Sequence, residues 1–134
     1  MANHLDIEIV TPERAAFHAV AVDVILPGAL GEMDVLPGHR SLVTLVPGGL
    51  VTVTTNQGMK RRFAVGGGFA EIDDDKVSLL VAWCDGAEDV DVEMARRDLA
   101  ALEAVRDESD FMTEADLAER TAQLARSRAR LAVV

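Results

Sequence analysis

Apolar and polar residues alternate with a period of two through the first two thirds of the chain, as in Leu5, Ile7 and Ile9. This period places successive side chains on opposite faces, which is typical of a half-buried β-strand. Strands are predicted over residues 5–9, 19–26, 33–36, 41–46, 50–55, 61–65, 69–72 and 77–82. In the second of these runs, four apolar residues are expected to share one face: Val20, Val22, Val24 and Leu26.

Turn signals separate these runs. Pro-Gly pairs recur every ten residues, at 27–28, 37–38 and 47–48. Proline presets φ and glycine accepts a positive φ, so each pair predicts a turn. Further turns are predicted at 56–58, 66–68 and 73–75. Short strands with turns about every 8–12 residues are typical of a β-sandwich or barrel, and we expect two stacked antiparallel sheets.

A helical period replaces the alternation after about residue 88. Apolar residues then recur at spacings of three and four, at Val92, Ala95, Leu99, Leu102 and Val105. Asp91 is placed to cap this helix. A break is expected over 106–112. The chain is therefore predicted to be mainly β with α, with an antiparallel β-sandwich over 1–88 and an antiparallel two-helix hairpin over 89–134.

The second predicted helix starts at a segment that resembles a capping box, from Thr113 to Asp116, with Asp in place of Glu or Gln. Its apolar edge, which Arg128 interrupts, consists of Leu117, Thr121, Leu124 and Leu131. Both helical stripes are narrow and rich in alanine. At about 25 cal/mol per Å² of buried apolar surface, such a hairpin would be held by a few kcal/mol at most. We expect that it can move.

Composition limits the classes of protein that fit. Of 134 residues, 49% are hydrophobic and 27% are charged, which argues against disorder. A net charge of -10 argues against nucleic-acid binding, which needs clustered Lys and Arg. Cys84 is the single cysteine, so no internal disulfide forms and a reducing compartment is expected. With no apolar run of about 18 residues and no export signal at the start, we expect a soluble cytoplasmic chain.

The charge is distributed unevenly. The last fifteen residues carry +4 and no carboxylate, whereas the 119 residues before them carry nine bases against 23 acids, a net of -14. A basic end on an acidic body can fold back onto its own domain or reach an acidic surface elsewhere. Arginines in the last turns of a helix also complement its dipole, which leaves a purely local role open.

Residues that often carry chemistry form no recognisable catalytic set. The three histidines have no metal-ligand spacing, and Cys84 is more consistent with a buried small residue than with a nucleophile. The acidic run at 73–75 lacks the ligand spacing of an EF-hand and fits a hairpin turn. No serine occupies a nucleophile elbow. These features predict a binding or regulatory module, not an enzyme.

Several motifs resemble a known family. Residues 26–39 read LPGALGEMDVLPGH, and residues 63–72 read FAVGGGFAEI. With the opening turn TPER at 11–14, they resemble, in order, the hallmark segments of the epsilon subunit of F-type ATP synthases. The resemblance extends from about Leu5 to Val133. Two departures stand out: Asp34 replaces a usual glycine, and Ala82-Trp83-Cys84-Asp85 replaces a more common Ala-Asp/Glu-Ser-Ala.

The resemblance implies a β-sandwich of two five-stranded sheets and a helical hairpin. It also implies a non-catalytic rotor subunit, peripheral at the cytoplasmic face of the bacterial inner membrane. The sandwich would grip the gamma subunit and rest on the polar loops of the c-ring, coupling proton-driven rotation to the alpha and beta subunits. Gly31, Glu32 and Met33 would face the c-ring, with His39 and Arg40 near the same interface.

The resemblance gives the hairpin a regulatory role. It would either fold against the sandwich or extend into the catalytic headpiece and block ATP hydrolysis. In the extended state Arg126, Arg128 and Arg130 would meet acidic residues of the alpha and beta subunits.

Some relatives also bind ATP through an I/L-D-x-x-R-A segment and arginines of the second helix. The corresponding residues here are Val90, Asp91, Ala95, Arg126 and Arg130. Met94 replaces the motif arginine, and a lost charged hydrogen bond costs roughly 1.5–3 kcal/mol, so ATP binding should be weak or absent. No other cofactor and no metal is expected.

A different class of function stays open from the residues themselves. A free-standing β-sandwich could bind a ligand, with its helices forming a dimer. That alternative predicts a concave apolar pocket with convergent polar groups. The aromatic residues available to line it are Trp83 and four phenylalanines.

Overall fold

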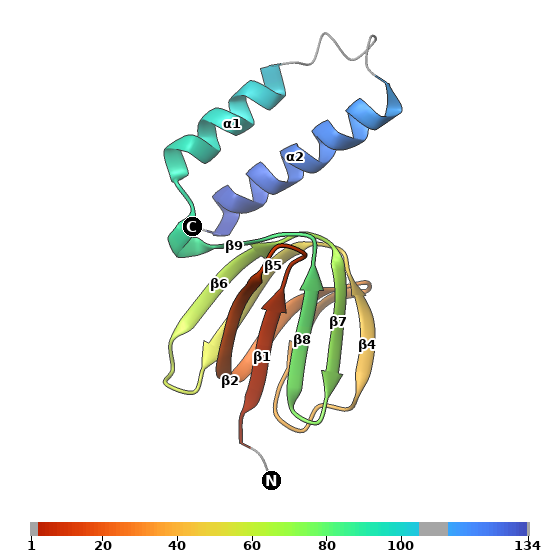
Figure 1. Cartoon of the computed structure of the whole chain (residues 1–134). Helices are drawn as coiled ribbons and strands as arrows, with labels where there is room; N and C mark the ends of the chain where they lie inside the picture. Colours follow the sequence, from red (N-terminus) through yellow and green to blue (C-terminus); the bar gives the residue numbers. More distant parts are fainter. Residues whose placement is uncertain (1–2, 105–112, 134) are drawn as a thin grey trace.

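A β-sandwich with two helices at one end makes up the computed structural model, which describes residues 3–104 and 113–133 (Figure 1). The strands are β1 (Leu5–Val10), β2 (Ala15–Gly28), β3 (Gly31–Val35), β4 (Leu42–Val46), β5 (Gly49–Thr55), β6 (Lys60–Val65), β7 (Gly68–Asp73), β8 (Lys76–Val81) and β9 (Cys84–Gly86). A 3-10 turn, η1 (Ala87–Asp89), leads to α1 (Val92–Ala104), and α2 (Glu114–Val133) follows. The predicted sandwich and helical hairpin are confirmed.

Nine strands are connected by one path of hydrogen bonds in the order β4-β7-β8-β1-β2-β5-β6-β9, and β3 pairs with β2. Strand β2 is long enough to belong to both layers: its first half pairs with β1, and its second half pairs with β3 and β5. The expectation of purely antiparallel sheets was wrong in one place, because β1 and β8 pair in parallel. These strands are far apart in sequence, and no local turn constrains their direction.

The core lies between the two layers and consists of β-branched and leucine side chains. Leu5, Ile7 and Ile9 are fully buried, as their alternation predicted. The second run behaves differently. A β-bulge between Ala21 and Asp23 shifts the register of β2 against β5, so Ala21 and Val24 are buried while Val20 and Val22 are half-buried. The extra residue of a bulge reverses the alternation, and the expectation of one continuous apolar face was wrong.

Two of the three Pro-Gly pairs form turns, with φ of 84° at Gly38 and 89° at Gly48. The first pair does not turn the chain, contrary to expectation. Pro27 pairs with Glu32 and Gly28 with Gly31 inside the β2–β3 ladder, and the turn follows at residues 29–30. The register of β2 with β5 ends at Ile25, so the missing N–H of Pro27 breaks no bond on that side.

Both helices begin at the predicted caps. Asp91 Oδ1 accepts a hydrogen bond from the Met94 amide at 3.1 Å. In the second helix, the Asp116 amide donates to Thr113 Oγ1 at 3.1 Å, and the Thr113 amide donates to Asp116 Oδ2 at 3.2 Å. This reciprocal pair is a capping box in which Asp116 occupies the position that is usually Glu or Gln. Val105 and the expected break at 106–112 lie outside the described residues.

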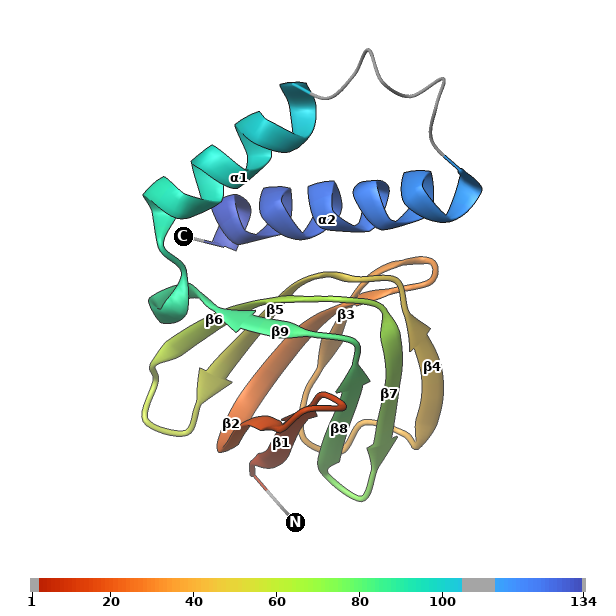
Figure 2. The same cartoon turned by 45° about the horizontal axis from the view of Figure 1, so that its top comes forward.

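The helices bury little surface of their own, as the narrow stripes predicted. Ala95 is the buried residue of α1, and Ser127 and Val133 are those of α2. Helix α2 contacts α1 on one side and strands β5 and β6 on the other, and it lies across the end of the sandwich in Figure 2. The last strand ends at Gly86 and α1 begins at Val92, so the boundary predicted after residue 88 falls between them.

Candidate functional site

A cluster of charged side chains joins α2 to the sandwich. Asp85, on β9, accepts hydrogen bonds from two arginines one helical turn apart. Arg126 Nε lies 3.0 Å and Arg130 Nε 2.9 Å from Asp85 Oδ2, and the Nη2 atoms of both arginines approach Oδ1 at 3.1 and 3.5 Å. We call Asp85, Arg126 and Arg130 the hairpin latch, because they connect the hairpin to the last strand.

The environment of the latch favours the ionised carboxylate. The Asp85 side chain is 15% exposed, against 39% for Arg126 and 31% for Arg130. Burial acts to raise the pKa of Asp85, but the hydrogen bonds and positive charges of Arg126 and Arg130 outweigh it and hold the pKa below its ordinary value. The latch is therefore a partly dry ion triad at the boundary between the two parts of the chain.

Two further contacts support the docked hairpin. The Arg126 guanidinium lies over the Trp83 ring, 4.7 Å from its centroid, as a cation–π contact. Arg62 of β6 donates to the carbonyl of Ala132 at 3.3 Å, near the C-terminal end of α2. That position suits a cation because the last carbonyls of a helix carry partial negative charge.

The contact between α2 and the sandwich is loosely packed. A cavity of ≈ 390 Å³ lies there. Its lining includes Ala122, Ala125 and Ala129 of α2, the glycine turns at 47–49 and 66–67, and Trp83. A gap of this kind forfeits dispersion contacts on both sides. The interface therefore depends more on the latch than on apolar packing.

The basic end of the chain folds back onto its own domain. Arg120 donates to the Leu102 carbonyl of α1 at 3.2 and 2.8 Å from Nε and Nη2. Arg128 pairs with Glu103 of α1 at 3.4 Å, both side chains being well exposed. With Arg126 and Arg130 in the latch, all four arginines of the +4 segment have partners within the chain.

The residues predicted for ATP are only partly brought together. Val90, Asp91, Ala95 and Arg130 line a cavity of ≈ 100 Å³, together with Met94 and Asp85. Arg126 lies instead at an adjoining cavity of ≈ 360 Å³ between the helices, which Arg130 also lines. Pockets for small molecules usually measure about 300–1,000 Å³. The smaller cavity is below that range. In addition, the Asp85 carboxylate already accepts the hydrogen bonds that Arg126 and Arg130 would donate to a phosphate.

The segment predicted to face a c-ring forms the start of β3. Gly31 has a φ of 123° and is exposed, Glu32 is exposed, and Met33 packs partly against the core. The preceding tip residue, Leu30, is fully exposed at 105%. A Cβ on Gly49 would contact Pro27 at 3.4 Å, so this hairpin lies beside the 47–49 turn. The segment is therefore at the same end of the sandwich as α2 (Figure 2).

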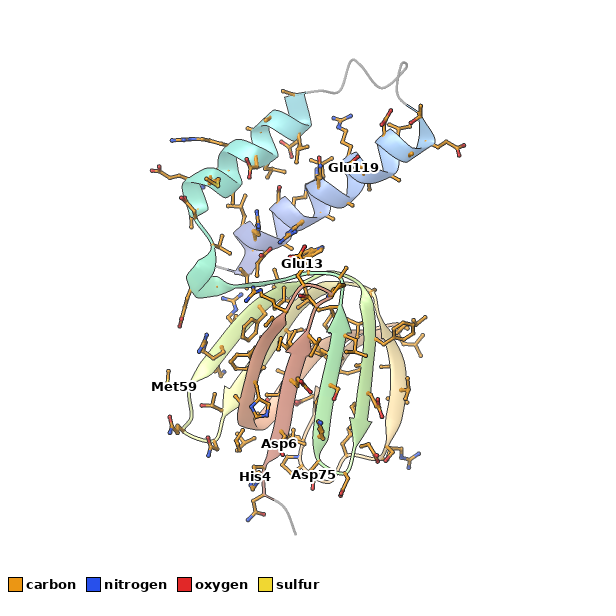
Figure 3. The ribbon with its side chains drawn as sticks, in the orientation of Figure 1. His4, Asp6, Glu13, Met59, Asp75 and Glu119 are labelled. Atoms are coloured by element: carbon orange, nitrogen blue, oxygen red, sulfur yellow. The ribbon has the colours of Figure 1, made fainter. Side chains whose placement is uncertain are left out.

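His39 and Arg40 do not lie beside that segment. They belong to the turn after β3, where the Gly38 amide donates to Asp75 Oδ1 at 2.7 Å. Figure 3 places Asp75 at the end of the sandwich away from the helices. His39 is half-buried, and its Nδ1 lies 2.7 Å from the Arg40 carbonyl. Strand β3 thus separates the two predicted interface segments, and one contact surface would have to span its length.

A row of exposed apolar side chains crosses three neighbouring strands. Leu45 of β4 pairs with Phe69 of β7, and Phe69 pairs with Leu80 of β8. Their exposed fractions are 60%, 53% and 50%. We call these three residues the apolar row. Large apolar groups in register on one exposed face mark an interaction surface more often than scattered ones do. Val43 on the outermost strand, 68% exposed, extends the same region.

The latch carboxylate and the apolar row escaped the sequence analysis. The row had a local signal, because β4 (LVTLV) and β8 (KVSLLV) are apolar at positions on both faces. A strand that is solvated on one face usually alternates more strictly. Asp85 had no local signal, since its partners are 41 and 45 residues away.

The described residues contain neither a membrane-spanning helix nor a cluster suited to a metal ion. Neither described helix is long and apolar enough to span a bilayer. In the same residues, no cluster of three or more His, Cys, Asp or Glu side chains is placed to hold a metal ion. Cys84 is buried, as expected.

The sequence matches known proteins over most of its length. Residues 4–86 match the family model described as "ATP synthase, Delta/Epsilon chain, beta-sandwich domain". The ATP synthase epsilon chain of Moorella thermoacetica is 39% identical over 127 residues, covering 95% of this chain and 93% of that protein. The epsilon chain of Solibacter usitatus is 37% identical over 135 residues, covering 98% and 96%.

Solved structures share the fold. A chain in the cryo-EM structure of the mitochondrial ATP synthase of Euglena gracilis superimposes with a TM-score of 0.79 and 22% identity. The match covers 98% of this chain and 82% of that one. At this identity the likeness bears on the fold alone.

Proposed function

This chain belongs to the delta/epsilon family of ATP synthase chains, as an epsilon chain, and from that membership we propose that it is a non-catalytic rotor subunit. The sandwich binds the gamma subunit and the c-ring, and so transmits rotation to the catalytic alpha and beta subunits. The chain is held at the cytoplasmic face of the bacterial inner membrane through these partners. A free-standing ligand-binding module fits less well, because the larger described cavities lie at the helices or at open surface and not between the sheets.

The apolar row is the observation that carries this proposal. A monomeric protein gains nothing from placing three large apolar side chains in register on an exposed face, whereas an obligate subunit buries them against its partner. Gamma is the partner we assign, because a rotor subunit needs a permanent contact with the shaft. Permanent interfaces are more hydrophobic than transient ones, and an aromatic side chain such as Phe69 is of the kind enriched at their centre.

The test is binding of the gamma subunit to the full-length chain, measured by calorimetry. Phe69→Glu places a charge in the centre of the row, and we expect it to weaken binding at least tenfold, about 1.4 kcal/mol. Met59→Glu is the matched control, because Met59 is similarly exposed at 56% and lies at a different edge of the sandwich (Figure 3). Equal binding by both variants would place the gamma contact elsewhere.

The tip of the β2–β3 hairpin is the part we assign to the c-ring. Exposed Leu30 and Glu32 project from a short hairpin that a polar loop could meet. Glu32→Lys should leave the thermal midpoint nearly unchanged, since exposed charge changes are usually within about 0.5 kcal/mol. It should reduce ATP-driven proton pumping in membrane vesicles. Unaltered pumping would remove Glu32 from the interface.

The hairpin is the part we assign to inhibition of ATP hydrolysis. In the docked state Arg126 and Arg130 are occupied by Asp85, and release of the latch would free both for acidic residues of the headpiece. The equilibrium between the docked and the extended hairpin shifts with any change that stabilises one of the two states more than the other. The double variant Arg126→Ala with Arg130→Ala removes both arginines from the docked state and from the extended state. We expect it to weaken the extended, inhibiting state more, so hydrolysis by the complex should rise. Unchanged hydrolysis would exclude these arginines from inhibition.

We propose that ATP does not bind this chain appreciably. Asp85 already satisfies the two arginines that a phosphate would need, and Met94 offers no charge in place of the motif arginine. Equilibrium dialysis with ATP on the full-length chain tests this directly. Asp85→Ala should restore some binding, whereas tight binding by the unaltered chain would contradict the proposal.

A further inference from the structure

Two carboxyl groups meet on neighbouring strands at the base of the β2–β3 hairpin. Asp34 of β3 stands opposite Ile25 of β2, and Asp23 lies two residues from Ile25 along the same strand. Residues two apart on a strand point to the same face, so Asp23 and Asp34 are diagonal neighbours. Asp34 is also the residue whose side chain and charge act with burial to raise the pKa of Asp23. Because both are carboxyl groups, a hydrogen bond between them requires a proton on one of them.

The surroundings of Asp23 favour its protonated form. The bulge in β2 sets Asp23 opposite Thr54 of β5. Its Oδ1 atom is buried and has no hydrogen-bond donor among the described residues. A buried carboxylate oxygen without a donor is costly, and protonation reduces that cost.

Few charges act on the pair. Burial first, then the hydrogen bond and the charge of Asp34, raise the pKa of Asp23 to about 6, and Lys60 from β6 acts in the opposite direction. Thr54 on β5 is uncharged, and β1 pairs with β2 only as far as Ala21. Strand β4, which also contacts β2, has no ionisable side chain. Within the described residues, no further charged group stands out as a counter-ion for Asp23.

We propose that Asp23 and Asp34 share one proton, and that loss of this proton loosens the pairing of β3 with β2. Two carboxylates in contact repel each other when both are ionised. Strand β3 is sensitive to this repulsion because, among the described strands, it pairs with β2 alone. The hairpin is therefore firm when the pair holds its proton and opens more often when it does not. The exposed tip with Glu32 therefore also moves more often when the pair has lost its proton. The effect of this motion on the c-ring contact rests on the proposed function, whereas the proton-sharing pair itself does not.

The test is a carboxyl-carbon NMR titration of the full-length chain, with amide hydrogen exchange in β3. We expect Asp23 to titrate near pH 6 and Asp34→Asn to lower that midpoint by at least one unit, a tenfold loss of proton affinity. Asp98→Asn, an exposed acid on α1, is the control and should leave it unchanged. Opening of β3, corrected for intrinsic exchange, should increase by about tenfold between pH 5 and pH 7.5.

The variants separate the pair from a general effect of pH. Asp23→Asn and Asp34→Asn keep the side-chain shape. Asp23→Asn should make the opening of β3 independent of pH in that range, and Asp34→Asn should make its dependence on pH clearly weaker than in the unaltered chain. A midpoint for Asp23 near pH 4 in the unaltered chain overturns the proposal, as does a β3 opening rate that does not change with pH. Neither measurement needs the ATP synthase, so failure of the proposed function would leave both results interpretable.

Discussion

Single residues decide how the hairpin is held. Asp85 satisfies two arginines at once, and its side chain is the most buried member of the latch. The helix caps at Asp91 and Thr113 were predictable from sequence, because a cap involves residues three apart. The latch was not, because its partners meet only after the whole sandwich has folded between them. At this scale, hydrogen bonds between residues close in sequence can be predicted, whereas ion pairs between residues distant in sequence cannot.

Asp85→Asn should weaken docking of the hairpin. It removes the carboxylate that faces Arg126 and Arg130, and hydrogen bonds to charged groups contribute about 1.5–3 kcal/mol, less here because both arginines are about a third exposed. Emission from Trp83, the single tryptophan, reports docking because Arg126 covers its ring. Glu103→Gln breaks the exposed pair with Arg128 and serves as control, with an expected effect below about 0.5 kcal/mol. Similar emission changes in both variants would argue against the latch.

Docking should also depend on pH in the acid range. The pKa of Asp85 is lowered in the docked state, so its contribution is complete above the ordinary carboxyl value of about 4 and is lost as pH falls through the lower, docked-state pKa. The Trp83 signal of the unaltered chain should therefore change below about pH 4. In Asp85→Asn the same signal should stay flat through that range. An identical acid transition in both proteins would assign the pH effect to other carboxylates.

Strands and helices were largely predictable as elements, and their exceptions have identifiable causes. The eight predicted strands are all present, because alternation and turn residues act locally. The ninth, Cys84–Gly86, has three residues, too few to show a period. The bulge at 21–23 and the parallel β1–β8 pairing depend on partners distant in sequence. The first Pro-Gly pair was wrongly predicted as a turn, because Pro27 is tolerated inside β2 where the pairing of β2 with β5 has already ended.

Two adjacent leucines on β8 allow a matched test of which face of this strand packs into the core. Leu79 is fully buried and Leu80 is 50% exposed. Leu79→Ala should lower the free energy of unfolding by about 2–5 kcal/mol, because it leaves a cavity in the core. Leu80→Ala should change it by about 0.5 kcal/mol or less, yet weaken gamma binding, because Leu80 belongs to the apolar row. Urea denaturation and calorimetry with gamma measure the two effects. Equal losses of stability would mean that Leu80 is not a surface residue.

At the scale of the whole molecule, the chain combines a sandwich with its own core and a hairpin attached mainly by charge. All residues of the core cluster lie at or before Cys84. This division was predictable from the change of period near residue 88. The placement of α2 against β5 and β6 was not, because the alanines of α2 and the glycine turns beneath them carry no directional signal.

A fragment of residues 1–88 should therefore fold alone and bind gamma with nearly the affinity of the full chain. It keeps every strand and the apolar row, and it loses only the hairpin and the latch. Circular dichroism and calorimetry with gamma check both properties. An unfolded fragment, or a folded one that does not bind, would show that the hairpin is part of the rotor-binding unit.

The most direct test of the account is restoration of coupling in an ATP synthase from which the epsilon chain has been removed. ATP-driven proton pumping in membrane vesicles would be measured after adding back the full-length chain, Phe69→Glu or Met59→Glu. We expect pumping to return with the unaltered chain and with Met59→Glu, but not with Phe69→Glu at the same concentration. Failure of the unaltered chain to restore pumping, or full restoration by Phe69→Glu, would contradict a rotor subunit that docks through its apolar row.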